Sequence, residues 1–234
     1  MREITLQTTV SEIVSIVPHT SDLFRQLRID FCCGGKISLA EAAQMRQLDS
    51  EQVLASVLDI AEKSEGNAEV EPTSYSPKKL IEHIESKHHA YLREEFQQLT
   101  PYVTKVARVH GERHPHLLRI QEIYSNLKHD LLEHTDEEEQ IVFPLINKYV
   151  DNPSEANRFN LLPYLTDLEQ DHENAGDLLK ELREITNDFE PPFDACGTYR
   201  LVYSRLAMLE KDTFEHIYLE NHVLFDNVRK MVLS

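Results

Sequence analysis

The same pattern of histidine and glutamate occurs twice in this chain, in segments that start 82 residues apart. His134 is followed four residues later by Glu138, and His216 is followed in the same way by Glu220. In an α-helix, residues i and i+4 lie on the same face, about one turn apart. An imidazole and a carboxylate in this arrangement can bind one transition-metal ion together. The repeat therefore favours a fold in which helices bring two such pairs together.

A single histidine precedes each pair by about 45 residues: His89 stands before His134, and His172 stands before His216. The order histidine, then His-x3-Glu, thus occurs twice along the chain. Two helical hairpins that close around two metal ions would need this order of ligands.

Residues 77–234 are predicted to form an antiparallel four-helix bundle. Four long segments with helical periodicity follow one another here, and short connections containing glycine or proline separate them. The predicted helical segments are 77–110, 115–149, 157–188 and 197–232. No segment alternates in the manner of a strand, so the predicted fold class is all-α.

Residues 1–64 are predicted to form a separate, small helical domain. Its first helices lie around 9–17 and 20–29, and Ser38 with Glu41 has the form of a capping box that opens a third helix. Asp49 can cap a fourth helix that runs to about Lys63. The polar residues 65–76, which include proline and glycine, are predicted to be a linker between the two domains.

The candidate ligands lie on the helix faces that should be buried, where hydrophobic residues are expected. A carboxylate buried without a partner costs several kcal/mol, and metal coordination would compensate its charge. In the first bundle helix, His88 and His89 are adjacent, and spacing alone prefers His89 only modestly. The remaining histidines are expected to be solvated or to lie at helix ends: His19, His83, His110, His114, His116, His129 and His222.

Imidazole and carboxylate ligands without thiolate suit iron, manganese or zinc. A tetrahedral zinc site would be complete with four ligands, whereas this chain offers four histidines and two glutamates on four helices. Two glutamates that can bridge point to a pair of iron ions. The remaining coordination positions could take water, an oxo bridge, or a diatomic ligand such as NO or O₂.

The charge of the chain excludes several classes of partner. It contains 24 basic and 41 acidic residues, for a formal net charge of −17. Nucleic acids and anionic membranes would be repelled. No apolar run approaches the roughly 20 residues that span a bilayer, and the first residues lack the apolar core of a signal peptide. We therefore expect a cytoplasmic protein that binds neither nucleic acid nor membranes.

The three cysteines do not suggest a disulfide framework. Cys32 and Cys33 are adjacent, and a disulfide between neighbours closes a strained ring, so we expect a pair of reduced thiols. Cys196 stands alone and is expected to have no role.

Two sets of motifs resemble the Repair of Iron Centres family of di-iron proteins. The stretch Asp30-Phe-Cys-Cys-Gly-Gly-Lys36 resembles the double-cysteine signature of its small N-terminal domain. Three further stretches resemble its hemerythrin-like metal-binding domain: His134-x3-Glu138-Glu-Gln-Ile-Val-Phe-Pro144, Asp171-His172-Glu173-x-Ala-Gly176 and His216-x3-Glu220-Asn-x-Val-Leu-Phe225. The resemblance extends from about residue 6 to about residue 230.

The resemblance implies a complete set of ligands for two iron ions, with the two glutamates as bridges: His89, His134, Glu138, His172, His216 and Glu220. It selects His89 over His88. Oxygen-carrying hemerythrins have a histidine where Gly176 stands and a longer spacing from histidine to carboxylate in the last helix. In both respects this chain resembles the repair family instead.

The function implied by the resemblance is repair of iron–sulfur clusters damaged by nitric oxide or peroxide, by donation of iron to damaged or apo iron–sulfur proteins. Cys32 and Cys33 would then be iron-binding or redox thiols. Two alternatives remain open: a di-iron nitric oxide reductase or peroxidase, and a sensor of diatomic gases. Whether the protein is an enzyme, and whether it is a monomer or a homodimer, also stays open.

Overall fold

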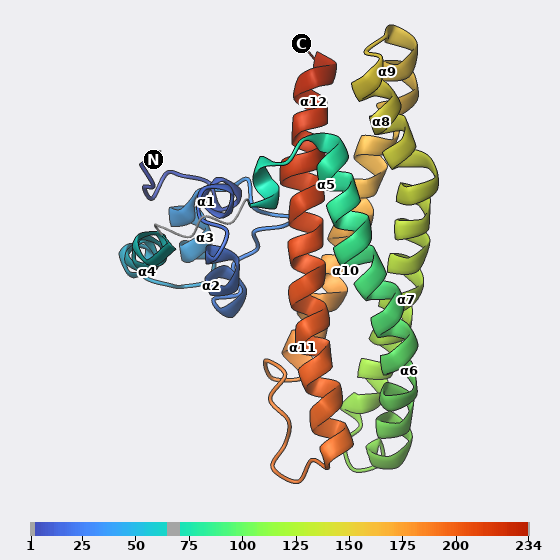
Figure 1. Ribbon diagram of the computed structural model, residues 1–234. Helices are drawn as coiled ribbons and strands as arrows, with labels where there is room; N and C mark the ends of the chain where they lie inside the picture. Colours follow the sequence, from blue (N-terminus) through green and yellow to red (C-terminus); the bar gives the residue numbers. More distant parts are fainter. Residues whose placement is uncertain (1–2, 65–70, 234) are drawn as a thin grey trace. The chain divides into compact units, whose positions relative to one another are not determined.

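The computed structural model describes residues 3–64 and 71–233, and helices dominate it (Figure 1). No strand occurs in these two ranges; an isolated antiparallel bridge joins Thr9 and Ser38. The all-α prediction is therefore confirmed. Within the same ranges, no helix has the length and apolar character that crossing a membrane requires.

Four helices form in the N-terminal segment at the places where the sequence predicts them. They are α1 (Val10–Ile16), α2 (Thr20–Gln26), α3 (Leu39–Met45) and α4 (Ser50–Ser64). The capping box of Ser38 and Glu41 is present at the start of α3. Asp49 accepts hydrogen bonds from two backbone amides in the first turn of α4. A second capping box, formed by Thr9 and Glu12, opens α1.

The four long predicted segments are also helical, but each is interrupted at one place. The first consists of α5 (Pro77–His83), η2 (Ile84–His89) and α6 (Ala90–His110); the second of α7 (His116–Glu137), η3 (Glu138–Val142) and α8 (Phe143–Asp151); the third of α9 (Glu155–Leu161) and α10 (Tyr164–Ile185); and the fourth of α11 (Gly197–Tyr218), η4 (Leu219–Phe225) and α12 (Asp226–Leu233). The segments η2, η3 and η4 are π-helical.

Part of the predicted linker, residues 65–70, lies outside the described residues. Its last part contains one 3₁₀ turn, η1 (Pro72–Ser74). Pro77 is the first residue of α5, where its missing N–H is harmless.

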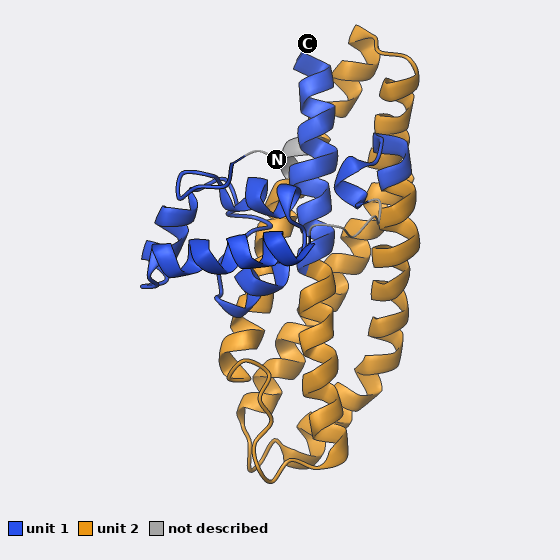
Figure 2. Ribbon diagram, turned by 60° about the vertical axis from the view of Figure 1, so that its left-hand side comes forward, with its two compact units in different colours: residues 1–80, 214–234 blue, residues 81–213 orange. Residues whose placement is uncertain are grey.

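The chain divides into two compact units (Figure 2). Unit 1 contains residues 1–80 and 214–234, and unit 2 contains residues 81–213. The boundary between Thr213 and Phe214 falls inside α11. The predicted domains follow the order of the chain, whereas the compact units group the end of the last long helix with the N-terminal segment.

Within unit 2, the long helices are joined around a ring by polar contacts. Tyr124 donates to the carbonyl of Phe96 between α7 and α6, Arg119 pairs with Glu181 between α7 and α10, Arg183 with Glu210 between α10 and α11, and Arg205 with Glu95 between α11 and α6. Each helix thus contacts the next, as in an antiparallel bundle with short connections. Glu210 is fully buried, so losing its partner Arg183 would destabilise the fold more than breaking a surface ion pair would.

Within unit 1, Tyr218 and Phe31 form the contact between the last long helix and the N-terminal helices. The Tyr218 hydroxyl lies 3.0 Å from the carbonyl oxygen of Ser11, to which it donates, and 2.6 Å from Ser15 Oγ. The ring of Phe31 packs edge-on against Phe214, with a centroid distance of 6.3 Å. Residues far apart in the sequence therefore share one small core.

Candidate metal centre

All six predicted ligands are nearly inaccessible to solvent. Their exposed fractions are 0% for His89, Glu138, His216 and Glu220, 1% for His172 and 4% for His134. Burying ionisable groups is expensive unless a counter-charge compensates it. A metal cation would supply the positive charge that the two buried carboxylates need.

Within unit 2, Glu138 lies between two histidines. Its Oε2 atom is 3.4 Å from Nε2 of His89, and its Oε1 atom is 3.4 Å from Nε2 of His134. The Nε2 atoms of His134 and His172 are only 2.8 Å apart. Two neutral ring nitrogens at this distance need a proton or a cation between them, because their lone pairs repel each other.

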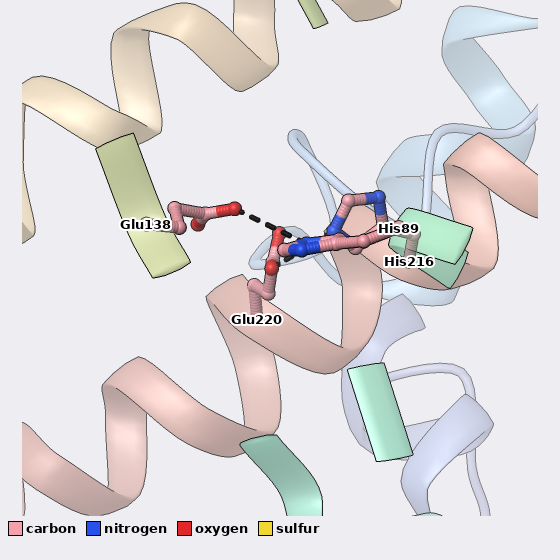
Figure 3. Close-up of side chains that lie close together, drawn as sticks. All are labelled: His89, Glu138, His216 and Glu220. Carbon is pink, nitrogen blue, oxygen red and sulfur yellow. Dashed lines mark hydrogen bonds and ion pairs between the residues drawn. The ribbon is translucent and has the colours of Figure 1, made fainter. Parts of the chain in front are cut away.

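Within unit 1, His216 and Glu220 contact each other along one helix face. Nε2 of His216 is 2.8 Å from Oε1 of Glu220 (Figure 3). The i, i+4 spacing that the sequence repeats is thus realised as a direct contact.

The ligand atoms fall into two groups, and within each group they all lie within 4.8 Å of one another. The first group is His89, Glu138, His216 and Glu220, the set drawn in Figure 3; the second is His134, Glu138, His172 and Glu220. Glu138 and Glu220 occur in both groups. The donor set of each group, two imidazoles and two carboxylates, suits iron, manganese or zinc.

Each of the three π-helical segments carries a ligand. His89 is the last residue of η2, Glu138 is the first residue of η3, and Glu220 is the second residue of η4. A π-turn adds one residue to a helix and is frequent at functional sites. It also shifts the buried face: Ile141, three residues after Glu138, is 39% exposed, whereas Val142 is completely buried. Helical periodicity cannot reveal such a shift.

Two carboxylates outside the ligand set hold ligand rings, and sequence reasoning missed both. Glu139 Oε1 lies 2.8 Å from Nδ1 of His89. Asp171 Oδ2 lies 3.4 Å from Nδ1 of His134. Because an ionised carboxylate only accepts, Nδ1 of each ring carries the proton, and Nε2 is left with a lone pair for a metal.

The pKa values of these two carboxyl groups support their ionised state. Burial raises the pKa of Glu139, but hydrogen bonds from Arg93 and His89 outweigh this effect and bring the pKa below its ordinary value. The hydrogen bond from His134 holds the pKa of Asp171 below its ordinary value.

His88 is buried like its neighbour, but it takes part in a different interaction. Its Nδ1 atom lies 3.0 Å from Oδ1 of Asp212 on α11. Among the described residues, the first group of candidate ligands contains His89, and neither group contains His88. The two adjacent histidines are therefore directed to different partners.

The double-cysteine turn is held tightly by its own aspartate. Oδ1 of Asp30 accepts hydrogen bonds from the backbone amides of Cys32, Cys33 and Gly34. The two Sγ atoms are 3.5 Å apart, too far for a disulfide bond, so the expected pair of thiols is present. At Gly35, a Cβ atom would lie only 2.5 Å from the carbonyl oxygen of Phe31, which explains the need for glycine.

Asn221 and His222, which follow Glu220 directly, contact this turn within unit 1. Nδ2 of Asn221 donates a hydrogen bond of 3.1 Å to the carbonyl of Cys32. His222, expected to be solvated, is half-buried beside the same backbone, and burial lowers its pKa. That expectation was wrong because the contact depends on the N-terminal segment, which helical spacing does not include. Cys196 is exposed, with Sγ 3.4 Å from Nε2 of His110.

Comparison with known proteins adds two family matches and close relatives. Residues 6–61 match the family ScdA_N, described as "Domain of Unknown function (DUF542)", and residues 80–228 match the "Hemerythrin HHE cation binding domain". The chain is 41% identical to the "Iron-sulfur cluster repair protein ScdA" of Staphylococcus haemolyticus over 223 residues, which cover 95% of this chain and 98% of the relative. It is 33% identical to the "Iron-sulfur cluster repair protein YtfE" of Escherichia coli O157:H7 over 216 residues, which cover 92% and 94%. The chain therefore belongs to the Repair of Iron Centres family, with a ScdA_N segment followed by a hemerythrin HHE cation-binding domain.

Proposed function

We propose that this protein holds two iron ions and supplies iron to iron–sulfur proteins whose clusters have been damaged by nitric oxide or peroxide. The observation that carries the proposal is the composition of the two ligand groups. Each group contains two histidines that the other group lacks, and both groups contain Glu138 and Glu220. Two carboxylates common to both groups are what bridges between two ions require.

The proposed ligands are His89 and His216 at one position, His134 and His172 at the other, and Glu138 and Glu220 as bridges. When bound, the irons would supply redox chemistry and open coordination positions for NO or O₂. The protein side chains keep the site buried and orient the rings through Glu139 and Asp171. The names of the relatives support an iron–sulfur protein as the recipient.

Cys32 and Cys33 are proposed to bind iron as it leaves. Together with Asp30, they form a third group whose ligand atoms lie within 4.8 Å of one another. Thiolates are softer ligands than imidazole and carboxylate, and iron–sulfur proteins themselves bind iron through thiolates. Cys32 is buried and Cys33 is partly exposed, so Cys33 is the thiol that a recipient would meet first.

The proposal is tested by following iron. Purified protein would be analysed for iron content and by Mössbauer spectroscopy, before and after anaerobic incubation with an apo iron–sulfur enzyme and a sulfide source. About two irons per chain at the start, which fall as the enzyme regains activity, are expected. The variant with serine at both positions, Cys32→Ser with Cys33→Ser, should keep its iron but transfer it more slowly.

Other outcomes would contradict the proposal. Two irons that remain bound while NO is consumed and nitrous oxide is formed would favour a nitric oxide reductase. Retention of both irons without turnover would favour a sensor. Protein that binds no iron, or only zinc, would contradict the ligand assignment itself.

A further inference from the structure

We propose that the two metal positions hold metal with different strength, and that the position formed by His134 and His172 releases its metal first. This inference rests on the proposed function, since it names the part of the site from which iron would leave. It depends on the carboxylates that contact Nδ1 of the ligand rings, Glu139 and Asp171, rather than on the ligands themselves.

The ring of His89 is held from several sides. Its Nδ1 atom lies 2.8 Å from Glu139, and the same carboxylate oxygen accepts a hydrogen bond of 2.7 Å from Arg93. Arg93 is held in turn by Asp136, at 2.9 Å. The ring also stacks on buried Phe143, with a centroid distance of 5.7 Å and an angle of 14° between the planes. The orientation of this imidazole is therefore set before any metal binds.

The ring of His134 packs edge-on against the ring of His172, with a centroid distance of 4.6 Å, but its outer hydrogen bond is weaker. Its outer contact, to Asp171, is 3.4 Å long, and the Asp171 side chain is 52% exposed. In the described part of the chain, no lysine or arginine pairs with Asp171, so no cation orients this carboxylate as Arg93 orients Glu139. A hydrogen bond of this length is weak, and water can compete for both of its partners.

Glu138, the carboxylate that contacts both rings, does not produce this difference. Glu138 is equally distant from both histidines, with contacts of 3.4 Å to His89 and 3.4 Å to His134. Both histidines are also almost fully buried, so solvent access to the rings is similar. What differs is the hydrogen bond behind each ring, and changes to such outer partners typically cost a metal site about 10–100-fold in affinity.

Metal release requires a ligand ring to turn away from the ion. When the ring of His134 turns, the outer hydrogen bond that it loses is long, whereas the ring of His89 must break a network of charged groups and leave its stacking partner. An iron at the His134 position is therefore expected to leave first, and the iron at the His89 position is expected to remain longer.

The first experiment measures the order of loss with the full-length protein loaded with two ferrous ions. A ferrous chelator is added without oxygen, and native mass spectrometry follows the species with two, one and no irons. The species with one iron is expected to accumulate. Glu139→Gln should accelerate the second loss by about 10–100-fold and remove this accumulation, whereas Asp171→Asn should affect the first loss alone, by a smaller factor. Glu82→Gln, at an exposed carboxylate of α5, is the control and should change neither rate.

The second experiment identifies the positions. Metal-free protein labelled with ¹⁵N in its histidine rings is titrated with zinc as a diamagnetic probe. The first equivalent should shift Nε2 of His89 and His216, and the second should shift Nε2 of His134 and His172. The reverse order, four rings that shift in proportion, or iron loss in a single step would overturn the inference while leaving the proposed function intact. Protein that binds no second metal would overturn both. Ordered loss of iron that no apo enzyme can use would contradict the proposed function alone.

Discussion

Unit 2 contains two sets of histidines with different surroundings. His89, His134 and His172 are buried beside Glu138 or beside one another, and their Nε2 atoms face other ligand atoms. A second set, His110, His114 and His116, lies next to the connections between the helices and faces hydroxyl, thiol or exposed carboxylate groups instead. There, Nε2 of His116 lies 3.0 Å and 3.1 Å from the hydroxyls of Tyr199 and Tyr203.

The comparison shows that the number of histidines does not by itself define a metal site. His110 contacts exposed Cys196, and His114 lies 3.5 Å from exposed Asp194. Protein groups and water can satisfy these rings. The ligand set differs because burial leaves its carboxylates and imidazoles without solvent, so that a cation is the natural compensation.

The largest expected effect is loss of metal from the buried set. Changing Glu138 to leucine removes a carboxylate common to both ligand groups, so the second iron should be lost while helix content is largely preserved. Iron analysis and circular dichroism measure the two quantities. Glu220→Leu should behave in the same way.

Glu133→Leu is the matched control, since it changes a carboxylate on the same long helical segment that is 72% exposed. It should retain both irons. If Glu138→Leu and Glu220→Leu also retained two irons, the assignment of bridging carboxylates would be wrong.

A smaller effect is expected when the second set is changed. His116→Ala removes the partner that two buried tyrosine hydroxyls share and leaves them only their mutual contact of 3.4 Å, so that one hydroxyl loses a hydrogen bond. An unsatisfied buried polar group costs about 1–3 kcal/mol. The free energy of unfolding in urea should fall by about this amount, with iron content unchanged. His129→Ala, at a side chain that is 68% exposed, is the control and should be nearly neutral. Loss of iron from His116→Ala would remove the distinction between the two sets.

The stability of the protein should also depend on the pH through His116. Burial, with a contribution from His114, lowers the pKa of His116 in the folded state. Its neutral form therefore stabilises the fold above the unfolded pKa of about 6.5, and this contribution declines as the pH falls from there through the folded pKa. Unfolding of metal-free protein in urea at pH values of about 7.5 and about 5.5, on either side of that unfolded pKa, measures it. His116→Gln, which can accept a hydrogen bond but does not titrate, should lose less stability over this interval than the native chain; equal losses would exclude His116 as the source.

The smallest effect is expected at Cys196. Its thiol is exposed, and substitutions at such positions usually change stability by less than about 0.5 kcal/mol. Cys196→Ser should therefore leave iron content, unfolding and iron transfer as they are. A fall in iron transfer comparable to that of the Cys32 and Cys33 variant would show that Cys196 takes part in function.

The sequence allowed much of the fold to be predicted because the relevant interactions are local. The capping box of Ser38 and Glu41 joins residues three apart, and the contact between His216 and Glu220 joins residues four apart. Proline and glycine likewise mark helix ends through their own backbone restrictions. The fold class and five of the six candidate ligands could therefore be predicted from spacing and burial pattern, whereas the choice of His89 over His88 depended on the family resemblance.

The sequence by itself determined which helices form and which side chains they carry on their buried faces. Only the tertiary structure decided the partners of those side chains: Glu139 behind His89, Asp171 behind His134, Asp212 beside His88. It also decided where three π-turns shift the buried face of a helix. The physical reason is that such contacts join residues 37 to 124 positions apart, so they depend on the rotation and axial position of each packed helix. Those quantities are set by the packing of the whole core, whereas local periodicity describes one helix at a time.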